Sequence, residues 1–190
     1  EQLPRIYLAD DQSAGRGRHG RSWSSNRGSL TFSLLIDWPL DDDGPTRLLS
    51  LAVGVGVARA IENSFAPLRT QLKWPNDVHI DFGKVAGVLI ERSLCSRQRA
   101  VVGVGMNVSQ TPDLETTDRQ SPRSIPARSI AEVTCRPIDR YGMLESSFSQ
   151  IFEAIEALRE SDEEILGQYR SRCLLTGRRV TFREGNEVVQ

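Results

Sequence analysis

Cationic side chains alternate with glycines near the start of this 190-residue chain. Glycines let backbone N–H groups approach a ligand closely, and arginines present planar forks that match phosphate or carboxylate oxygens. Since the rest of the chain is charge-balanced and the net charge is −1, we expect this segment to close over an anionic group. The cationic residues are Arg16, Arg18, His19, Arg21 and Arg27, and the glycines among them are Gly15, Gly17 and Gly20.

The spacing of these glycines also matches the Gly-x-Gly-x-x-Gly pattern of dinucleotide-binding turns. Such a turn follows an apolar strand and opens an apolar helix. Here Asp10, Asp11 and Gln12 come before the glycines, and Ser22-Trp-Ser-Ser-Asn26 comes after them. The pattern therefore does not indicate a Rossmann fold, and no Walker phosphate loop occurs in the chain.

A second cluster, Lys73-Trp-Pro-Asn-Asp77, follows a predicted strand. Pro75 fixes the turn out of the strand, so Asn76 and Asp77 project from a rigid corner. An aspartate beside a lysine at a strand end can hold a metal ion, orient a nucleophile or form an ion pair. A turn stabilised by the Asn and Asp side chains explains this cluster equally well when it is taken alone.

Two further clusters lie on predicted strands. The segment Lys84-Val-Ala-Gly-Val-Leu-Ile-Glu91 begins with a lysine and is otherwise mostly apolar. Taken alone, Lys84 is more typical of an exposed lysine in a hairpin. Glycines inside a strand, such as Gly103 and Gly105, indicate the close approach of a ligand or another backbone. Asn107 follows them and offers a paired donor and acceptor, which would suit the edge of a base.

The composition is that of an ordinary domain with one sizeable core, because 38% of the residues are hydrophobic and 26% are charged. The nearest candidate for a membrane span, residues 48–61, is interrupted by Ser50 and Arg59. A net charge near zero argues against a dedicated duplex-DNA binder. With two histidines and no Cys-x-x-Cys motif, a zinc site is not expected. We expect a cytoplasmic protein with free thiols at Cys95, Cys135 and Cys173.

Hydrophobic periodicity predicts an α+β fold, a mixed or antiparallel sheet with helices packed on it. Gly54 and Gly56 are expected to let the first helix pack closely on the sheet. Residues 41–45 are predicted to form a turn and residues 110–128 a long loop. Strands are expected over 6–9, 30–37, 69–74, 78–81, 85–91 and 100–108, helices over 46–65, 139–161 and 162–175, and hairpins around 81–83 and around Glu184-Gly-Asn186, the latter between strands 178–182 and 187–189.

The chain ends inside the second of these hairpins. A single hairpin is marginal in water, so it either packs on the main domain or begins a second one. We favour the second interpretation, with one domain over residues 1–175 and the start of a truncated C-terminal β-domain over residues 176–190.

Taken together, the four clusters resemble the catalytic domain of biotin protein ligases, the biotin–[acetyl-CoA-carboxylase] ligases. The resemblance runs from about Leu8 to Val108 and more loosely to the final hairpin. It implies a fold like that of class II aminoacyl-tRNA synthetases and biotin ligases, followed by a small SH3-like domain. The matching stretches are Gln12-Ser-Ala-Gly-Arg-Gly-Arg-His-Gly-Arg21 with Trp23, Lys73-Trp-Pro-Asn-Asp77, Lys84-Val-Ala-Gly-Val-Leu89 and Gly103-Val-Gly-Met-Asn107.

This resemblance implies an enzyme that joins biotin to ATP as biotinyl-5′-AMP and passes biotin to a lysine of a biotin carboxyl carrier protein, with Mg²⁺ as cofactor. Arg16 and Lys84 match the positions that serve the biotin carboxylate and the α-phosphate. Asp77 matches a residue on the magnesium side, and it is also expected to help deprotonate the incoming lysine. The other matched positions are Gln12, Gly15, Gly87, Leu89 and Gly103 around biotin, and Arg18, Arg21, Trp23, Lys73, Asn76 and Asn107 around ATP and the adenylate.

The chain departs from the family pattern in two places. Family members carry a Ser-Thr-Asn segment ahead of the first strand, and nothing before Ile6 matches it. His19 stands where arginine is common. Without a helix-turn-helix, we expect no DNA binding, and we expect a monomer or homodimer that does not associate with membranes. The alternatives are a lipoate or octanoate ligase of the same fold and a non-catalytic nucleic-acid-binding module.

Overall fold

The computed structural model describes residues 2–38, 45–93, 96, 98–111, 126–184 and 187–189. Most of the predicted turn at 41–45, most of the loop at 110–128, Cys95 and the Gly-Asn of the last hairpin lie outside these residues. Among the described helices, none combines the length and apolar character needed to cross a bilayer.

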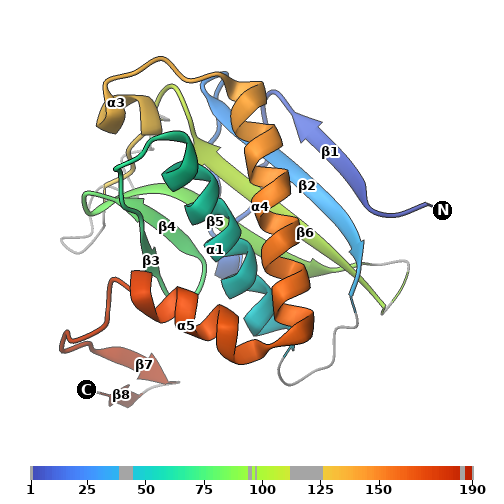
Figure 1. Cartoon of the computed structure of the whole chain (residues 1–190), viewed down its shortest axis with the longest axis vertical. Coiled ribbons are helices and arrows are strands. Elements are labelled where there is room, and N and C mark those ends of the chain that lie inside the picture. Colours follow the sequence, from blue (N-terminus) through green and yellow to red (C-terminus); the bar gives the residue numbers. More distant parts are fainter. Residues whose placement is uncertain are drawn as a thin grey trace.

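A six-stranded sheet forms the centre of the molecule, with the strand order β1-β2-β6-β5-β4-β3 (Figure 1). Every neighbouring pair is antiparallel, which is one of the two arrangements, mixed or antiparallel, that the sequence predicts. The strands are β1 Arg5–Ala9, β2 Ser29–Asp37, β3 Gln71–Lys73, β4 Asp77–Ile80, β5 Gly83–Arg92 and β6 Arg99–Asn107.

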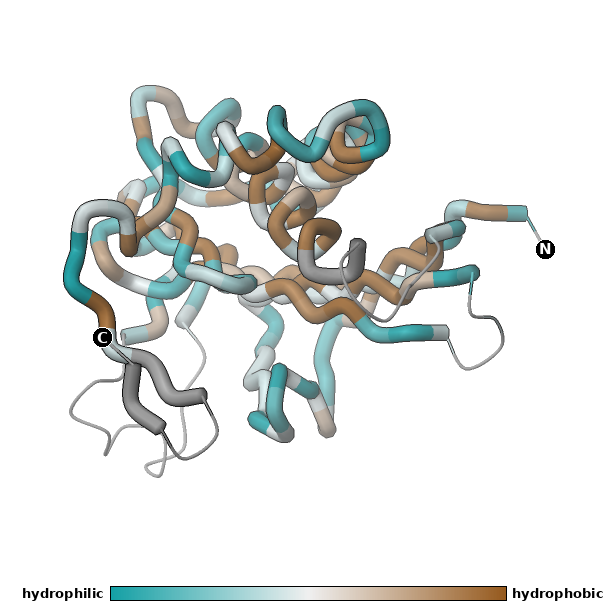
Figure 2. The backbone as a smooth tube through the Cα atoms, turned by 90° about the horizontal axis from the view of Figure 1, so that it is seen from below, coloured by the Kyte–Doolittle hydropathy of each residue, from teal (hydrophilic) through white to brown (hydrophobic). Residues whose placement is uncertain are grey.

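The long helices lie on one side of this sheet (Figure 2). α1 (Pro45–Ser64) packs against α4 (Arg140–Glu160), α5 (Asp162–Arg172) and the sheet, which explains why apolar residues surround it on most sides. The predicted packing of Gly56 on the sheet is wrong. A Cβ at this position would lie 2.6 Å from Ile151 Cα, so the glycine lets α4 approach instead. A Cβ at Gly54 would lie 3.8 Å from Leu72 of β3, so that glycine does face the sheet.

The prediction of the α5 helix is confirmed, but its end differs. It stops at Arg172 because the chain then joins the sheet edge, where the Leu174 N–H donates to the Leu72 carbonyl at 2.8 Å. A short helix, α3 (Ile130–Thr134), was not predicted. Its signal is nevertheless present, since Ser129 and Glu132 form a reciprocal capping box.

The last hairpin is confirmed as a pair of antiparallel strands, β7 (Phe182–Glu184) and β8 (Glu187–Val189). Its first strand begins later than predicted, at Phe182 rather than at position 178. In Figure 1 this hairpin lies apart from the six-stranded sheet. Whether it begins a second domain stays a prediction.

A buried carboxylate, Glu62, joins the end of α1 to the end of α5 and to the segment before β3. Glu62 of α1 accepts hydrogen bonds from the Thr70 amide at 3.0 Å, the Thr70 hydroxyl at 2.8 Å and Arg172 Nη2 at 2.8 Å. Burial by itself would raise the pKa of Glu62, but these hydrogen bonds and the charge of Arg172 hold it below the ordinary value of 4.5. The native state therefore binds this proton more weakly than the unfolded chain does. The corresponding stability is present above pH 4.5 and is lost as the pH falls below it.

Replacing Glu62 by glutamine should lower the free energy of unfolding at pH 7 by about 2–4 kcal/mol, because Arg172 would lose its charged partner in a largely buried place. The deficit relative to the unmodified chain should narrow as the pH falls below 4.5. Urea titrations between pH 3 and pH 7 measure both effects. The control is Glu153→Gln, whose half-exposed pair with Arg59 should contribute under about 1 kcal/mol. Equal deficits for Glu62→Gln at all pH values would contradict the assignment.

Candidate functional site

A cavity of about 710 Å³ opens on the side of the sheet opposite the core and the helices. Side chains alternate between the two faces of each strand. Val102 and Met106 of β6 are therefore buried in the core, whereas Gly103 and Gly105 line the cavity. The floor consists largely of small and polar side chains, which leaves room for a ligand.

Gly105 is required by an aromatic side chain that lies on it. A Cβ at this position would lie 2.6 Å from Cζ2 and from Nε1 of the Trp23 indole. The prediction that strand glycines mark a close approach is thus explained here by a side chain of the protein itself. Gly103 is less crowded, since a Cβ there would lie 3.5 Å from the nearest atom.

A β-bulge places Lys84 in the cavity. His79 is opposite Lys84 and Val78 is opposite Ala86, so Val85 is an extra residue on β5. In a regular strand, Lys84 and Gly87 would face opposite sides because they are three residues apart. The bulge brings both onto the cavity side, and the Lys84 ammonium would lie 3.4 Å from a Cβ at Gly87. This placement is consistent with the prediction that Lys84 has a function. It does not fit the alternative interpretation, in which Lys84 is only an exposed hairpin residue.

The glycine–arginine loop folds back on itself over the floor. The Trp23 N–H donates to the Gly15 carbonyl at 2.9 Å, and the Gly17 N–H donates to the Arg21 carbonyl at 2.7 Å. Its tip is a 3-10 turn, Arg18–Gly20, in which His19 has a left-handed φ of 57°. The loop therefore has its own backbone hydrogen bonds.

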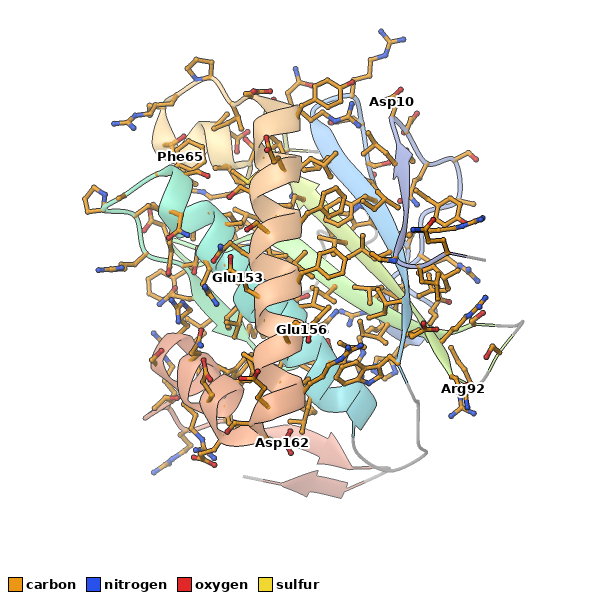
Figure 3. All side chains as sticks on the ribbon, turned by 45° about the vertical axis from the view of Figure 1, so that its right-hand side comes forward. Asp10, Phe65, Arg92, Glu153, Glu156 and Asp162 are labelled. Carbon is orange, nitrogen blue, oxygen red and sulfur yellow. The ribbon has the colours of Figure 1, made fainter. Side chains whose placement is uncertain are left out.

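An ion pair fixes the start of this loop. Asp10, at the end of β1, lies next to the first turn of α4 (Figure 3), where Arg140 Nη1 donates to its Oδ1 at 2.7 Å. Arg140 Nη2 also donates to the Ala9 carbonyl at 3.1 Å. The loop is thus held at its base while its cationic tip lies over the cavity.

Cationic side chains from two separate segments of the chain line the cavity. Arg16 of the loop lies 3.6 Å from Glu91, and its side chain is 75% exposed. Lys84 Nζ lies 2.7 Å from Asp77 Oδ1 and 5.6 Å from the centre of a Trp23 ring. The sequence contains two lysines, Lys73 and Lys84, and both line this cavity.

Two hydrogen bonds, one from a side chain and one from the backbone, hold the Lys73–Asp77 corner against β5. Asn76 Nδ2 donates to the Val88 carbonyl at 2.7 Å, and the Val88 N–H donates to the Asn76 carbonyl at 2.9 Å. On β6, Asn107 Nδ2 donates to the Arg128 carbonyl at 3.1 Å. The Asn107 side chain is thereby oriented, and its Oδ1 is buried without a partner among the described residues.

All but one of the predicted site residues line this cavity. The exception is Gly15, which contributes its carbonyl to the hydrogen bond with Trp23 instead. Sequence reasoning missed several polar residues that line the cavity. Most of them could have been found, because residues two positions apart in a strand share a face: one lies two positions after Asp77, and two others alternate along β2. They are Thr31, Ser33, His79 and Glu91.

Within the described part of the chain, no cluster of three or more His, Cys, Asp or Glu side chains could hold a metal ion. The arrangement suits a ligand with anionic groups, because Arg16 and Lys84 both line the cavity. Two cations from different segments could neutralise those groups, while the small floor residues and the indole contact its less polar parts.

Comparisons with known proteins agree with this geometry. The sequence profile of the Biotin/lipoate A/B protein ligase family matches residues 2–107. The chain is 33% identical over 181 residues to the biotin–[acetyl-CoA-carboxylase] ligase of Mycobacterium tuberculosis, covering 92% of this chain and 63% of that protein. It is 36% identical over 145 residues to the bifunctional ligase/repressor BirA of Bacillus subtilis, covering 74% of this chain and 42% of that one.

Among solved structures, the biotin protein ligase from Aquifex aeolicus in complex with biotin and ATP matches with a TM-score of 0.78 and 32% identity. That match covers 97% of this chain and 74% of the Aquifex chain. By contrast, the present chain spans less than two thirds of the length of the Mycobacterium tuberculosis and Bacillus subtilis proteins.

Proposed function

Because the chain belongs to the Biotin/lipoate A/B protein ligase family, we propose that it activates biotin with ATP. The reaction forms biotinyl-5′-AMP and releases pyrophosphate, and biotin then passes to a specific lysine of a biotin carboxyl carrier protein. The observation that carries this proposal is the convergence of Arg16 and Lys84 in one cavity with the Lys73–Asp77 corner.

The first step requires two anions to meet. A biotin carboxylate oxygen attacks the α-phosphorus of ATP, a new P–O bond forms, and the bond to the pyrophosphate leaving group breaks. Arg16 and Lys84 reduce the repulsion between carboxylate and phosphate, and preorganised charge of this kind is usually the largest contribution to such catalysis. Asp77 holds the Lys84 ammonium 2.7 Å away, so the ammonium is already oriented before the substrates bind.

The two ends of the cavity suit the two substrates. At the biotin end, the Gln12 side chain can hydrogen-bond the ureido ring, and Gly87, Leu89 and Gly103 leave a narrow slot. At the nucleotide end, the unpaired Asn107 Oδ1 can accept a hydrogen bond from the amino group of adenine. The Trp23 indole offers a flat surface beside it, and Arg18 and Arg21 line the loop above.

Mg²⁺ commonly binds through one or two carboxylates together with substrate phosphates. Asp77 and Glu91 are the carboxylates of this cavity, which is consistent with a magnesium ion held mainly by ATP. We assign Asp77 as its protein ligand, with Lys73 and Asn76 on the same side. When bound, Mg²⁺ would neutralise phosphate charge and favour the departure of pyrophosphate.

Transfer to the carrier requires a neutral lysine amine. We infer that Asp77 accepts its proton as the amine attacks the acyl carbon and AMP leaves. The ordered loop would exclude water from the mixed anhydride until then. Since both ATP and biotin-dependent carboxylases are intracellular, we place the reaction in the cytoplasm.

A lipoate or octanoate ligase is the main alternative within the same family. The relatives in two of these matches are named as biotin ligases. The chain also carries the Lys-Trp-Pro-Asn-Asp corner that the resemblance associates with biotin, and Lys73, Asn76 and Asp77 of this corner line the cavity. Some relatives are also repressors, but no feature of the described residues adds a DNA-binding function to this proposal.

Exchange of labelled pyrophosphate into ATP tests the proposal. The chain should catalyse this exchange when biotin is present and show only background exchange with lipoate, with octanoate or without an acid. Adding a carrier domain should then yield one biotinylated lysine by mass spectrometry. Exchange driven by lipoate or octanoate, but not by biotin, would overturn the assignment.

A further inference from the structure

Trp74 is a strongly exposed aromatic residue to which the mechanism above gives no role. It is 60% exposed, whereas Trp38 is buried in the core and Trp23 lies against Gly105. Leaving a large apolar ring in water is unfavourable, and tryptophan is enriched among the residues that anchor protein partners. Trp74 is therefore a candidate contact for another molecule.

Trp74 lines a second cavity, of about 760 Å³, beside the glycine–arginine loop. This cavity shares Arg16, Leu89 and Glu91 with the cavity described above. Trp74 and Pro75 line the second cavity and not the first. Because the two cavities share lining residues, the second one adjoins the place proposed above for the adenylate.

The backbone on both sides of Trp74 is held in place. Before it, Lys73 is the last residue of β3 and pairs with β4. After it, the Pro75 carbonyl accepts a hydrogen bond from the Ser50 hydroxyl of α1 at 3.4 Å. Asn76 forms two hydrogen bonds with β5, at 2.7 Å and 2.9 Å. A residue presented on such a fixed corner loses little conformational freedom when a partner binds, which favours affinity.

The second cavity combines an apolar part with positive charge. Trp74, Pro75 and Ile90 supply apolar surface, and Glu91 is the one carboxylate among the described residues that line it. The arginines that line it are Arg16, Arg18 and Arg21. A polypeptide with an apolar residue and acidic side chains matches both properties. A free phosphate would match the arginines alone and leave the indole uncovered.

We propose that the second cavity, with Trp74 as its anchor, is the docking surface for the carrier domain and binds an acidic segment beside the target lysine. The proposal rests on the ligase function proposed above and adds the surface that recognises its protein substrate. Trp74 packs on an apolar side chain of the carrier, and the arginines pair with its carboxylates. The target lysine then reaches the first cavity beside Arg16. Trp74 should therefore affect the transfer of biotin and not the formation of the adenylate.

Transfer from synthetic biotinyl-5′-AMP measures the second step by itself. The protein substrate is a biotin-free, tryptophan-free carrier domain of a biotin-dependent carboxylase. Trp74→Ala should lower kcat/KM for this carrier at least about tenfold, the scale expected for an aromatic anchor of an interface. Trp74→Phe keeps an apolar ring and should recover part of the loss. Biotin-dependent pyrophosphate exchange by Trp74→Ala should stay within about twofold of the unmodified rate, as expected for a residue outside adenylate formation.

Tyr141→Ala is the matched control, because Tyr141 is 66% exposed and lines neither cavity. This variant should leave kcat/KM for the carrier unchanged. A second carrier, in which the acidic residues nearest the target lysine are replaced by their amides, should react more slowly with the unmodified chain. Equal rates for the two carriers would contradict the acidic partner.

Tryptophan fluorescence tests the contact without any turnover. The carrier domain should shift the emission of the unmodified chain to shorter wavelength, because it covers the Trp74 indole, and Trp74→Phe should lack this shift. Normal transfer by Trp74→Ala, or an emission spectrum that the carrier leaves unchanged, would overturn the proposal. An equal loss of pyrophosphate exchange would also overturn it, by assigning the second cavity to ATP or pyrophosphate. If the unmodified chain shows no biotin-dependent exchange, the ligase function fails, while the fluorescence still tests the docking surface.

Discussion

Replacement of Lys84 by alanine is expected to slow biotin-dependent pyrophosphate exchange by at least about 10²-fold, by analogy with the loss of one oxyanion-stabilising donor. The β-bulge of β5 turns this ammonium into the cavity, and Asp77 holds it at 2.7 Å. Its charge acts where the carboxylate meets the α-phosphate, so the loss should appear mainly in kcat. Initial rates of exchange at saturating biotin and ATP measure this effect.

Lys84→Arg provides the control for charge. A guanidinium keeps the charge but is larger and planar, so it needs more room between Asp77 and the Trp23 ring, which lie 2.7 Å and 5.6 Å from the ammonium. It should therefore restore the rate only in part. Thermal unfolding would check that each variant is folded. A folded Lys84→Ala variant with a nearly normal kcat would show that Lys84 does not stabilise the transition state.

Replacement of Arg16 by alanine should also reduce adenylate formation by at least about 10²-fold. Its side chain is 75% exposed and makes one long ion pair, at 3.6 Å, with Glu91. Such a pair contributes little to stability, so the variant should unfold like the unmodified chain. A large loss of activity with unchanged stability would assign Arg16 to the substrates.

Arg59→Ala is the matched control for Arg16. Arg59 of α1 pairs with Glu153 of α4 at 2.7 Å, and Figure 3 shows Glu153 on the helical layer. Neither residue lines the cavity. Both substitutions remove one arginine and one ion pair, but only Arg16 reaches the cavity. If both variants lost activity equally, a general effect of charge would explain the result better than a contact with substrate.

Much of this site could be predicted because its chemistry is carried by short motifs. The glycines and arginines after β1, and the Lys73–Asp77 corner, each need particular residue types at fixed spacing. Periodicity also predicted the strands and the long helices, since β2 and β6 alternate and α4 repeats every three or four residues. The short turn at 81–83 also predicted the pairing of β4 with β5, whereas the order of the other strands in the sheet was not predicted.

The remaining features depend on contacts that local sequence does not record. The bulge at Val85 is set by how β4 pairs with β5, and it decides which face Lys84 occupies. Gly56 is explained by α4, which lies about a hundred residues further along the chain. His79 looks like one polar residue in a short apolar strand, and its orientation toward the cavity becomes visible only with the sheet register.

Kinetic coupling between Arg16 and Lys84 tests most directly whether these two segments act on the same developing charge. The rate of adenylate formation would be measured for Arg16→Ala, for Lys84→Ala and for the double variant. Residues that work as a unit are strongly non-additive, so the double variant should be at most about tenfold slower than the slower single variant. If the two losses multiply in full, Arg16 and Lys84 act independently, and their joint action on the carboxylate and the α-phosphate is contradicted.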